Sequence, residues 1–448
     1  MTNPQSAGPH DGVLVVVGSG IRLYREYLLA GAAAEHPLWL FDSGEPTWQK
    51  PYLTGFTQVD TSNPQALVDA ARALRRSRPV DGVFCFSEAL VEPAAAVADA
   101  LSLPGMSAEA VRNCRDKGRT RELLAAAGVG QPSSVAVSSL AEAAEAADAI
   151  GYPVVLKPRG LAGSLGVVFV SCAEELAGAY REAAAPSYPG VPVFTASVLV
   201  EEYVDGPEIS VDGLFADGAY QPLALARKRV ALPPYFEEEG HLVDPRDPLL
   251  SSEELTAFLA DVHRLLGAAD AITHTELKLT DSGPRLIEVN ARLGGGLIPY
   301  LGALSNGIDP GRVAARAALG RPVVPTADGR GRAAAIHFAY PDEDCTVDRV
   351  RLPRPGEVPG LHQAAALVEP GDVLRLPPRG YISRYAYAIC VADTVEECEA
   401  SLARAREAIG LERRPAPALD ADAAPELVWS RTTPGAADRT AAGAEDTR

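Results

Sequence analysis

The 448-residue sequence has no long apolar run and no leader-like segment. Its uninterrupted apolar stretches stay below the roughly 18 residues that a membrane-spanning helix needs. Met1–Asp11 is polar and lacks the hydrophobic segment of a secretory signal peptide. These absences predict a cytoplasmic protein without a membrane partner.

Cysteine pairs and an excess of basic charge are also missing. The six cysteines are scattered singly, without a CxxC pair, which is typical of reduced buried thiols and not of a disulfide framework or a metal site. Asp and Glu number 59 against 41 Lys and Arg, which gives a formal charge of -18. This surplus argues against a nucleic-acid partner, because a phosphate-backbone binder needs a basic surface, but it is compatible with a small basic pocket for a nucleotide.

The apolar content is ordinary, with 47% hydrophobic and 22% charged residues, so the chain can bury a large core. At roughly 150 residues per domain, the length suggests about three domains. Apolar runs predict strands at Val13–Gly18, Leu38–Asp42 and Gly82–Phe86, with helical stretches such as Gln65–Arg76 between them. This alternation predicts a doubly wound α/β domain over residues 12–112.

Beyond this region the residue patterns predict further helices and strands. The helices are Arg115–Ala127, Leu140–Ile150, Glu253–Leu266 and Val395–Ile409, and the strands are Pro153–Lys157, Val167–Val170, Val198–Glu202, Glu208–Phe215, His274–Leu279, Arg285–Val289, Ala334–Phe338 and Tyr385–Val391. Residues 326–412 are predicted to form a mixed α+β domain. Residues 413–448 are rich in Ala, Pro, Asp and Thr without periodicity, which predicts a disordered tail.

A glycine-rich loop follows a lysine at the end of a predicted strand. Residues Lys157–Val167 read KPRGLAGSLGV. Gly160, Gly163 and Gly166 would let backbone N–H groups approach phosphate oxygens, while Lys157 supplies a positive charge. It is not a Walker loop, because no GK[ST] precedes a helix. The other interpretation of this loop alone is a flexible hairpin turn with a solvated lysine.

Two later segments, His274–Lys278 (HTELK) and Ile287–Gly296 (IEVNARLGGG), concentrate polar residues on strands. The strand period of two places Glu288 and Asn290 on one face, and it likewise groups Glu276 with its polar neighbours. If the strands pair, two carboxylates and an amide oxygen converge, a set that suits Mg²⁺. The alternative is a charged solvent face, although Glu288 is flanked by apolar residues.

A third segment is an acidic strand end. Val198–Tyr203 reads VLVEEY and is followed by a turn at Asp205–Pro207 and then by Glu208. Backbone groups there could meet an adenine edge, and Glu208 could accept hydrogen bonds from ribose hydroxyls. Taken alone, the segment is more typical of a hairpin with acidic residues of purely structural role.

The order and spacing of these three segments resemble the ATP-grasp superfamily over Cys114–Leu301. The resemblance implies an ATP-grasp fold that mixes α/β and α+β structure, with an ATP-grasp domain over 113–325, a lid over about 130–203, and the doubly wound and mixed domains on either side. It also implies ATP and Mg²⁺, or Mn²⁺ in its place, as cofactors. The implied nucleotide contacts are Lys117, Lys157, Gly163, Ser164, Glu201, Glu202, Val204 and Glu208, the implied metal ligands are Glu276, Glu288 and Asn290, and the implied catalytic residues are Arg292 and Lys157.

Within that superfamily the sequence looks most like the L-amino-acid ligases. The features are HTELKLT with IEVNARLGGG, the segment Pro234–His241 (PYFEEEGH) and the segment Val368–Tyr385. The resemblance implies a ligase that activates a carboxylate as an acyl phosphate, joins it to an amine, and releases ADP and phosphate. It implies small-molecule partners, namely amino acids, and leaves a homodimer open.

The same resemblance suggests substrate contacts. Glu88 is the candidate for holding a substrate ammonium, although it could equally be a charge at a helix N-terminus. Arg292 and His274 would line the pocket, as would His241, and each histidine could instead be structural. Tyr235–Asp244 is expected to be an active-site loop that shapes selectivity.

Three rival functions stay open at this point. One is an ATP-grasp enzyme that activates formate or bicarbonate, as in purine biosynthesis or the carboxylases. Another is a nucleotide-binding protein that has lost catalysis. The last is a Rossmann-type oxidoreductase built on Gly18–Gly20, which lacks the rest of the dinucleotide fingerprint.

Overall fold

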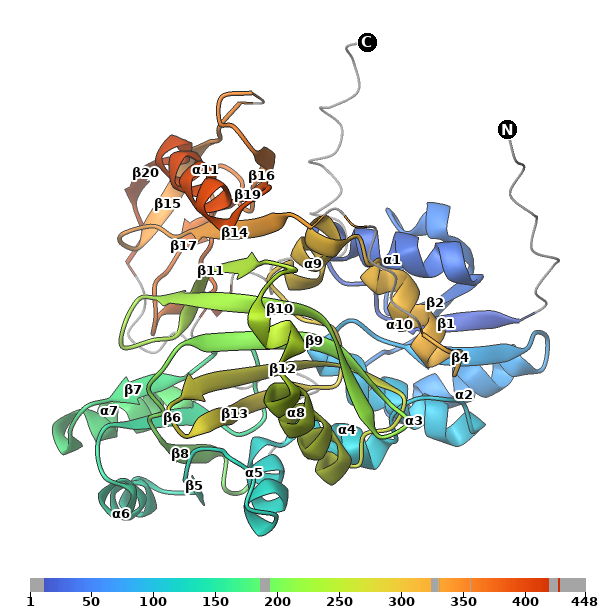
Figure 1. Cartoon of the computed structure of the whole chain (residues 1–448), viewed down its shortest axis with the longest axis horizontal. Coiled ribbons are helices and arrows are strands. Elements are labelled where there is room, and N and C mark those ends of the chain that lie inside the picture. The colour runs from blue at the N-terminus through green and yellow to red at the C-terminus, as the bar shows by residue number, and fades with distance from the viewer. Residues whose placement is uncertain are drawn as a thin grey trace.

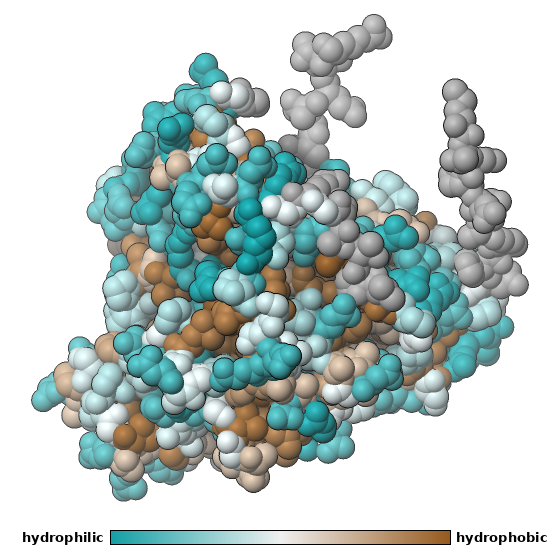
Figure 2. Space-filling view, in the orientation of Figure 1, coloured by the Kyte–Doolittle hydropathy of each residue, from teal (hydrophilic) through white to brown (hydrophobic). Residues whose placement is uncertain are grey.

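The computed structural model describes residues 12–185, 194–323, 329, 331–354, 356–418 and 426–427. Figure 1 shows an N-terminal α/β unit and a small lid sheet on two sides of a large central sheet, with the last helix packed against the upper end of that sheet. Figure 2 shows a mostly hydrophilic face with scattered apolar patches. In the described part of the chain no helix is long and apolar enough to cross a membrane.

Four parallel strands form the first sheet, in the order β3-β2-β1-β4. They are β1 (Val13–Val17), β2 (Leu38–Asp42), β3 (Leu53–Gln58) and β4 (Val80–Phe84), and they alternate with α1 (Arg22–Glu35), η1 (Lys50–Tyr52), α2 (Pro64–Arg75), η2 (Glu88–Leu90) and α3 (Val91–Leu101). Val15 of β1 packs in one core with Val97 of α3, and Leu14 packs in another with Leu28 of α1. Helices therefore cover both faces, as a doubly wound domain requires, although β4 begins two residues before its predicted start at Gly82.

The helix predicted over Arg115–Ala127 is confirmed, but it begins two residues later than predicted, after a break at Asp116. The structure has α4 (Ala108–Arg115) and α5 (Lys117–Ala126), separated by Asp116. The Asp116 carboxylate accepts a hydrogen bond from the Arg119 amide and pairs with Arg159 at 2.7 Å. This cap begins a new helix, so Lys117 lies in the first position of α5 and points out of the helix end.

The lid is an antiparallel sheet in the order β5-β8-β6-β7. Its strands are β5 (Ser134–Val137), β6 (Val154–Pro158), β7 (Val168–Val170) and β8 (Val198–Glu202), and its helices are α6 (Leu140–Ile150) and α7 (Ala173–Ala184). Val154 and Val200 pack with α6 and α7 in one core. The predicted hairpin on either side of the glycine-rich loop is confirmed.

The central sheet has eight antiparallel strands in the order β13-β12-β9-β10-β11-β14-β19-β16. They are β9 (Glu208–Ala216), β10 (Ala219–Ala231), β11 (Glu237–Val243), β12 (Ala271–Thr280), β13 (Gly283–Asn290), β14 (Ala333–Ala339), β16 (Leu361–Ala366) and β19 (Ala386–Ala392), with η3 (Pro248–Ser251), α8 (Glu253–Leu266), α9 (Ile298–Asn306) and α10 (Pro310–Ala318) between them. Strands from both sides of residue 325 belong to this one sheet, so the predicted C-terminal domain is joined to the ATP-grasp region by backbone hydrogen bonds.

Two further sequence predictions need correction in this half. Tyr235–Asp244 was predicted as a loop, but most of it is β11, because Gly240–Val243 pairs with β14 on one side and β10 on the other. The disordered tail was predicted to begin at residue 413, but Arg413–Pro415 belongs to β20 (Gly410–Pro415), which pairs with β15 (Cys345–Arg351). Residues 419–425 and 428–448 lie outside the described part. The remaining elements are β17 (Val373–Leu374), β18 (Gly380–Tyr381), α11 (Val395–Ala408) and β21 (Glu426–Leu427).

Candidate functional site

The buried end of the lid holds a charged triad. Lys157, near the end of β6, places Nζ 2.6 Å from Oε2 of Glu201 on β8. Arg121 of α5 pairs with the same carboxylate, with Nε 2.8 Å from Oε1. Burial alone would raise the pKa of Glu201, but the two cations lower it to about 2. Burial lowers the pKa of Lys157 to about 8 although Glu201 favours its charge. The ion pair with Glu201 therefore fixes the position of the Lys157 ammonium on the lid.

The glycine-rich loop between β6 and β7 contains several residues with left-handed backbone. Gly163, Ser164 and Gly166 have positive φ values of 71°, 57° and 69°, a region that favours glycine. Lys117 Nζ donates a hydrogen bond to the carbonyl of Leu161 in the loop. Ser164 therefore lies at the tip of a turn whose base is held by the first residue of α5.

The acidic strand end divides into two environments. Glu202 is partly exposed and pairs with Arg285 at 3.0 Å, at the rim of the lid, and Val204 beyond it is buried. Glu208, at the start of β9, lies inside, with Oε1 2.8 Å from Lys228 Nζ and Oε2 3.3 Å from Lys278 Nζ. Of the implied nucleotide contacts, Glu208 therefore faces the interior of the site, while the Glu202 carboxylate faces its edge.

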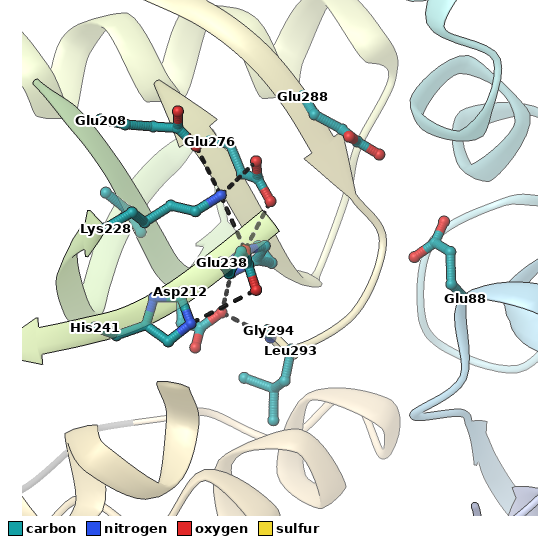
Figure 3. Close-up of polar contacts among 12 residues, drawn as sticks. Glu88, Glu208, Asp212, Lys228, Glu238, His241, Glu276, Glu288, Leu293 and Gly294 are labelled. Carbon is teal, nitrogen blue, oxygen red and sulfur yellow. Dashed lines mark hydrogen bonds and ion pairs between the residues drawn. The ribbon is translucent and has the colours of Figure 1, made fainter. Parts of the chain in front are cut away.

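The two polar strands pair as the sequence predicted. In the register of β12 and β13, Glu276 lies opposite Glu288 and His274 lies opposite Asn290. The carboxylates nevertheless diverge, because Glu276 points toward Lys228 and Glu288 points toward the N-terminal unit (Figure 3). Glu288 Oε1 is 3.1 Å from Lys117 Nζ, so the residue that holds the glycine-rich loop also contacts β13.

The Asn290 side chain sits between two carboxylates. One of its amide atoms is 3.2 Å from Glu288 Oε1 and 3.0 Å from Glu88 Oε2. That atom is the amide nitrogen, which donates a hydrogen bond to each carboxylate.

Glu88 is held by two guanidinium groups. Its Oε1 is 2.9 Å from Arg115 Nη1, and its Oε2 is 2.7 Å from Arg292 Nε. Burial would raise the pKa of Glu88, but Arg292 and Arg115 lower it. Arg292 also donates to the carbonyl of Leu293 at 2.8 Å. Glu88 and Arg292 thus lie side by side at the junction of the N-terminal unit and the central sheet.

The structure places His274 behind the site. The ring is buried, with Nδ1 2.9 Å from Asp212 Oδ1 and Nε2 3.4 Å from Glu276 Oε1. Burial would lower the pKa of His274, but hydrogen bonds to Asp212 and Glu276 raise it to about 9. Asp212 also accepts a hydrogen bond from the Gly294 amide at 2.9 Å. His274 therefore orients Glu276 and the glycine run instead of lining an open pocket.

His241, on β11, is fully buried beside the glycine run. Its Nε2 lies 3.6 Å from Glu238 Oε2, and within the described residues neither ring nitrogen makes a hydrogen bond. Burial lowers the pKa of His241. A β-carbon added at Gly296 would lie 2.6 Å from His241 Nε2, so only glycine fits there.

Sequence reasoning missed several residues of this site, above all Lys228, Arg121 and Asp212. Burial alone would lower the pKa of Lys228, but the carboxylates around it raise it well above its usual value. In the sequence, Lys228 stands in a run of three basic residues on β10, and only the alternation of a strand would have separated it from Arg227 and Arg229. No local pattern marks Arg121, on α5, as a partner of Glu201 on β8.

Two protein-family models match two separate regions of the chain. A model of the ATP-grasp domain matches residues 150–299, and a model of the ATP-grasp N-terminal domain matches residues 43–105. In sequence, the chain is 29% identical over 243 residues to the alanine–anticapsin ligase of Bacillus subtilis (strain 168), which covers 49% of this chain and 50% of that protein. It is also 29% identical over 362 residues to an uncharacterised protein of Sinorhizobium fredii, covering 79% of this chain and 72% of that one.

Among solved structures, the chain is similar to an L-amino acid ligase from Bacillus licheniformis. The TM-score is 0.74 and the identity 21%, over 91% of this chain and 100% of that one. It is also similar to a phosphoribosylglycinamide synthetase from Anaerococcus prevotii, with a TM-score of 0.65 and 17% identity, over 90% and 100% of the two chains. At these identities the likeness concerns the fold. The chain spans half the length of the Bacillus subtilis ligase that it matches.

Proposed function

Because this chain belongs to the ATP-grasp superfamily and has the ATP-grasp fold, we propose that it is an ADP-forming carboxylate–amine ligase. It binds ATP and Mg²⁺, activates a substrate carboxylate as an acyl phosphate, and transfers the acyl group to an amine. Both substrates are amino acids, and the product is a dipeptide or a related amide. The similarity to an alanine–anticapsin ligase and the fold of an L-amino acid ligase support this choice.

One observation supports the proposal above the others. Lys117 contacts both the glycine-rich loop, through the Leu161 carbonyl, and the carboxylate of Glu288 on β13. A cation that joins a phosphate-binding loop to a metal-binding carboxylate marks the place where the terminal phosphates of a nucleotide would lie. Phosphoryl transfer depends mainly on positioning and charge neutralisation, which this arrangement provides.

The side chains near β13 fit a magnesium ion in their chemistry. Glu288 and Asn290 supply a carboxylate and a side-chain amide that lie 3.2 Å apart, and turning the amide would direct its oxygen to a Mg²⁺ ion, which prefers oxygen ligands. Within the described residues no group of three or more His, Cys, Asp or Glu side chains is arranged to hold a metal, and the proposed set includes the amide of Asn290. Glu276, which points toward Lys228 in this structure, would have to turn toward Glu288 to complete the set. When bound, Mg²⁺ would neutralise charge on the phosphates.

The remaining steps fall to side chains of the chain itself. Lys157, fixed by Glu201, and Lys117 neutralise the phosphates from the lid side, and the loop around Ser164 excludes water from the acyl phosphate. Arg292 lies where a substrate carboxylate would enter and stabilises negative charge as the amine attacks. Glu88, which pairs with Arg115 and Arg292, is the candidate for orienting the substrate ammonium.

The proposed activity is tested by phosphate release from ATP and Mg²⁺ over a matrix of amino acids, singly and in pairs, with mass spectrometry of the products. We expect release only with particular amino acids, and a product mass equal to two substrates minus water. A Lys157→Met variant provides the background rate, because it lacks the buried charge on the lid. If no amino acid or pair gives phosphate release although ATP binding is confirmed, the substrate would be a different carboxylate, such as formate or bicarbonate, or the protein would bind nucleotide without turnover.

A further inference from the structure

A single buried lysine joins three strands of the central sheet at the proposed nucleotide site. Lys228 Nζ on β10 is 2.8 Å from Oε1 of Glu208 on β9, 2.9 Å from Oε2 of Glu276 on β12, and 3.1 Å from Oε1 of Glu238 on β11. Figure 3 shows the three carboxylates turned toward this one nitrogen from different sides. The lysine side chain is only 3% exposed, so solvent contributes little to neutralising them.

Each of the three carboxylates has a second cationic partner of its own. These partners are Lys278 for Glu208 at 3.3 Å, His274 for Glu276 at 3.4 Å and Arg384 for Glu238 at 3.3 Å. Lys228 is therefore the cation common to all three, and it fixes their positions relative to one another. Three ammonium protons match three acceptors, a geometry that a lysine satisfies and a planar guanidinium does not.

We propose that Lys228 is a positioning residue whose charge balances the affinities of the site for nucleotide and for metal. This inference rests on the proposed function, in which Glu208 meets the ribose and Glu276 is a metal ligand. Without Lys228 the local charge would be one unit more negative, which disfavours a polyanionic nucleotide and favours a divalent cation. The ammonium thus keeps Glu276 from binding metal too tightly before nucleotide arrives.

This role predicts effects of opposite sign in a Lys228→Met variant. A change of one unit charge at contact distance, partly shielded, is worth at least about tenfold in affinity. We expect ADP binding in the presence of EDTA, measured by calorimetry, to weaken by about that factor. We expect Mn²⁺ binding to the nucleotide-free protein, measured by electron paramagnetic resonance, to tighten by a similar factor, about tenfold. A lysine that only stabilises the fold would weaken both when removed.

Two further variants keep the inference testable if Lys228→Met unfolds. Glu238→Gln removes one negative charge from the same cluster, so ADP should bind more tightly and Mn²⁺ more weakly, the reverse pattern. The double variant Lys228→Met/Glu238→Gln returns the local charge to that of the wild type and should recover much of the ADP affinity. Arg227→Met is the matched control, because Arg227 is the neighbour of Lys228 but pairs with Asp247, outside the cluster, and its side chain is 42% exposed.

The outcomes separate this inference from the proposed function. If wild-type protein binds neither ADP nor Mn²⁺, both the function and the role of Lys228 are wrong. If it binds both, and the charge variants change the two affinities in the same direction or leave both as in Arg227→Met, only the role of Lys228 is wrong. Opposite changes in the two affinities, reversed in Glu238→Gln, would support it.

Discussion

Replacing Glu288 by glutamine is expected to lower amino-acid-dependent ADP formation by at least about 100-fold, the scale seen when a group that stabilises transferring charge is lost. The neutral amide cannot hold a cation with Asn290, and it leaves Lys117 without its partner at 3.1 Å. The measurement is steady-state ADP release with saturating amino acids, together with thermal unfolding of the variant.

The fold should survive this change, because Lys117 retains its hydrogen bond to Leu161 and Glu288 is not in a packed core. Glu109→Gln is a suitable control, since its carboxylate pairs with Arg119 on the surface and is 70% exposed. Near-normal ADP release in Glu288→Gln, with the control also normal, would remove the metal-site argument.

The second large effect is expected on stability. Glu201→Gln leaves Arg121 and Lys157 buried without their shared carboxylate, and breaking a buried pair in this way typically costs about 3–5 kcal/mol. Denaturant unfolding at neutral pH should show a loss of that size. Glu202→Gln is the matched control, because this neighbour pairs with Arg285 at the partly exposed rim of the lid and should cost less than about 1 kcal/mol.

The same carboxylate gives a pH signature. The pKa of Glu201 is about 2 in the folded protein, below the value of roughly 4.3 expected in the unfolded chain. Its stabilising contribution is therefore present above about pH 4.3 and is lost as pH falls toward 2. In that window the wild type should lose stability more steeply than Glu201→Gln. Equal free energies of unfolding for the two proteins at neutral pH would contradict the importance of the triad.

Much of this site could be predicted because strands impose simple rules. A period of two placed Glu288 and Asn290 on one face, and the observed register then set them opposite Glu276 and His274. The glycine-rich loop could also be predicted, because its glycines allow left-handed backbone that other residues rarely adopt. Local patterns were sufficient for these features.

Features that depend on distant partners were not visible. The ion pair between Asp116 and Arg159 joins residues 43 positions apart, and the strand β11 is set by pairing with β14. Lys228 acquires its role only when β9, β11 and β12 bring their carboxylates around it. Charged residues that come together from separate strands have no characteristic spacing in the sequence, so no local motif indicates them.

The central claim is that a substrate carboxylate takes the γ-phosphate of ATP. It is tested most directly by supplying the active amino acid with ¹⁸O in its carboxylate and measuring the label in the released phosphate by mass spectrometry. The account predicts that one ¹⁸O atom moves into phosphate for each amide formed, because the acyl phosphate loses its bridging oxygen to phosphate when the amine attacks. Amide formation with unlabelled phosphate would contradict it.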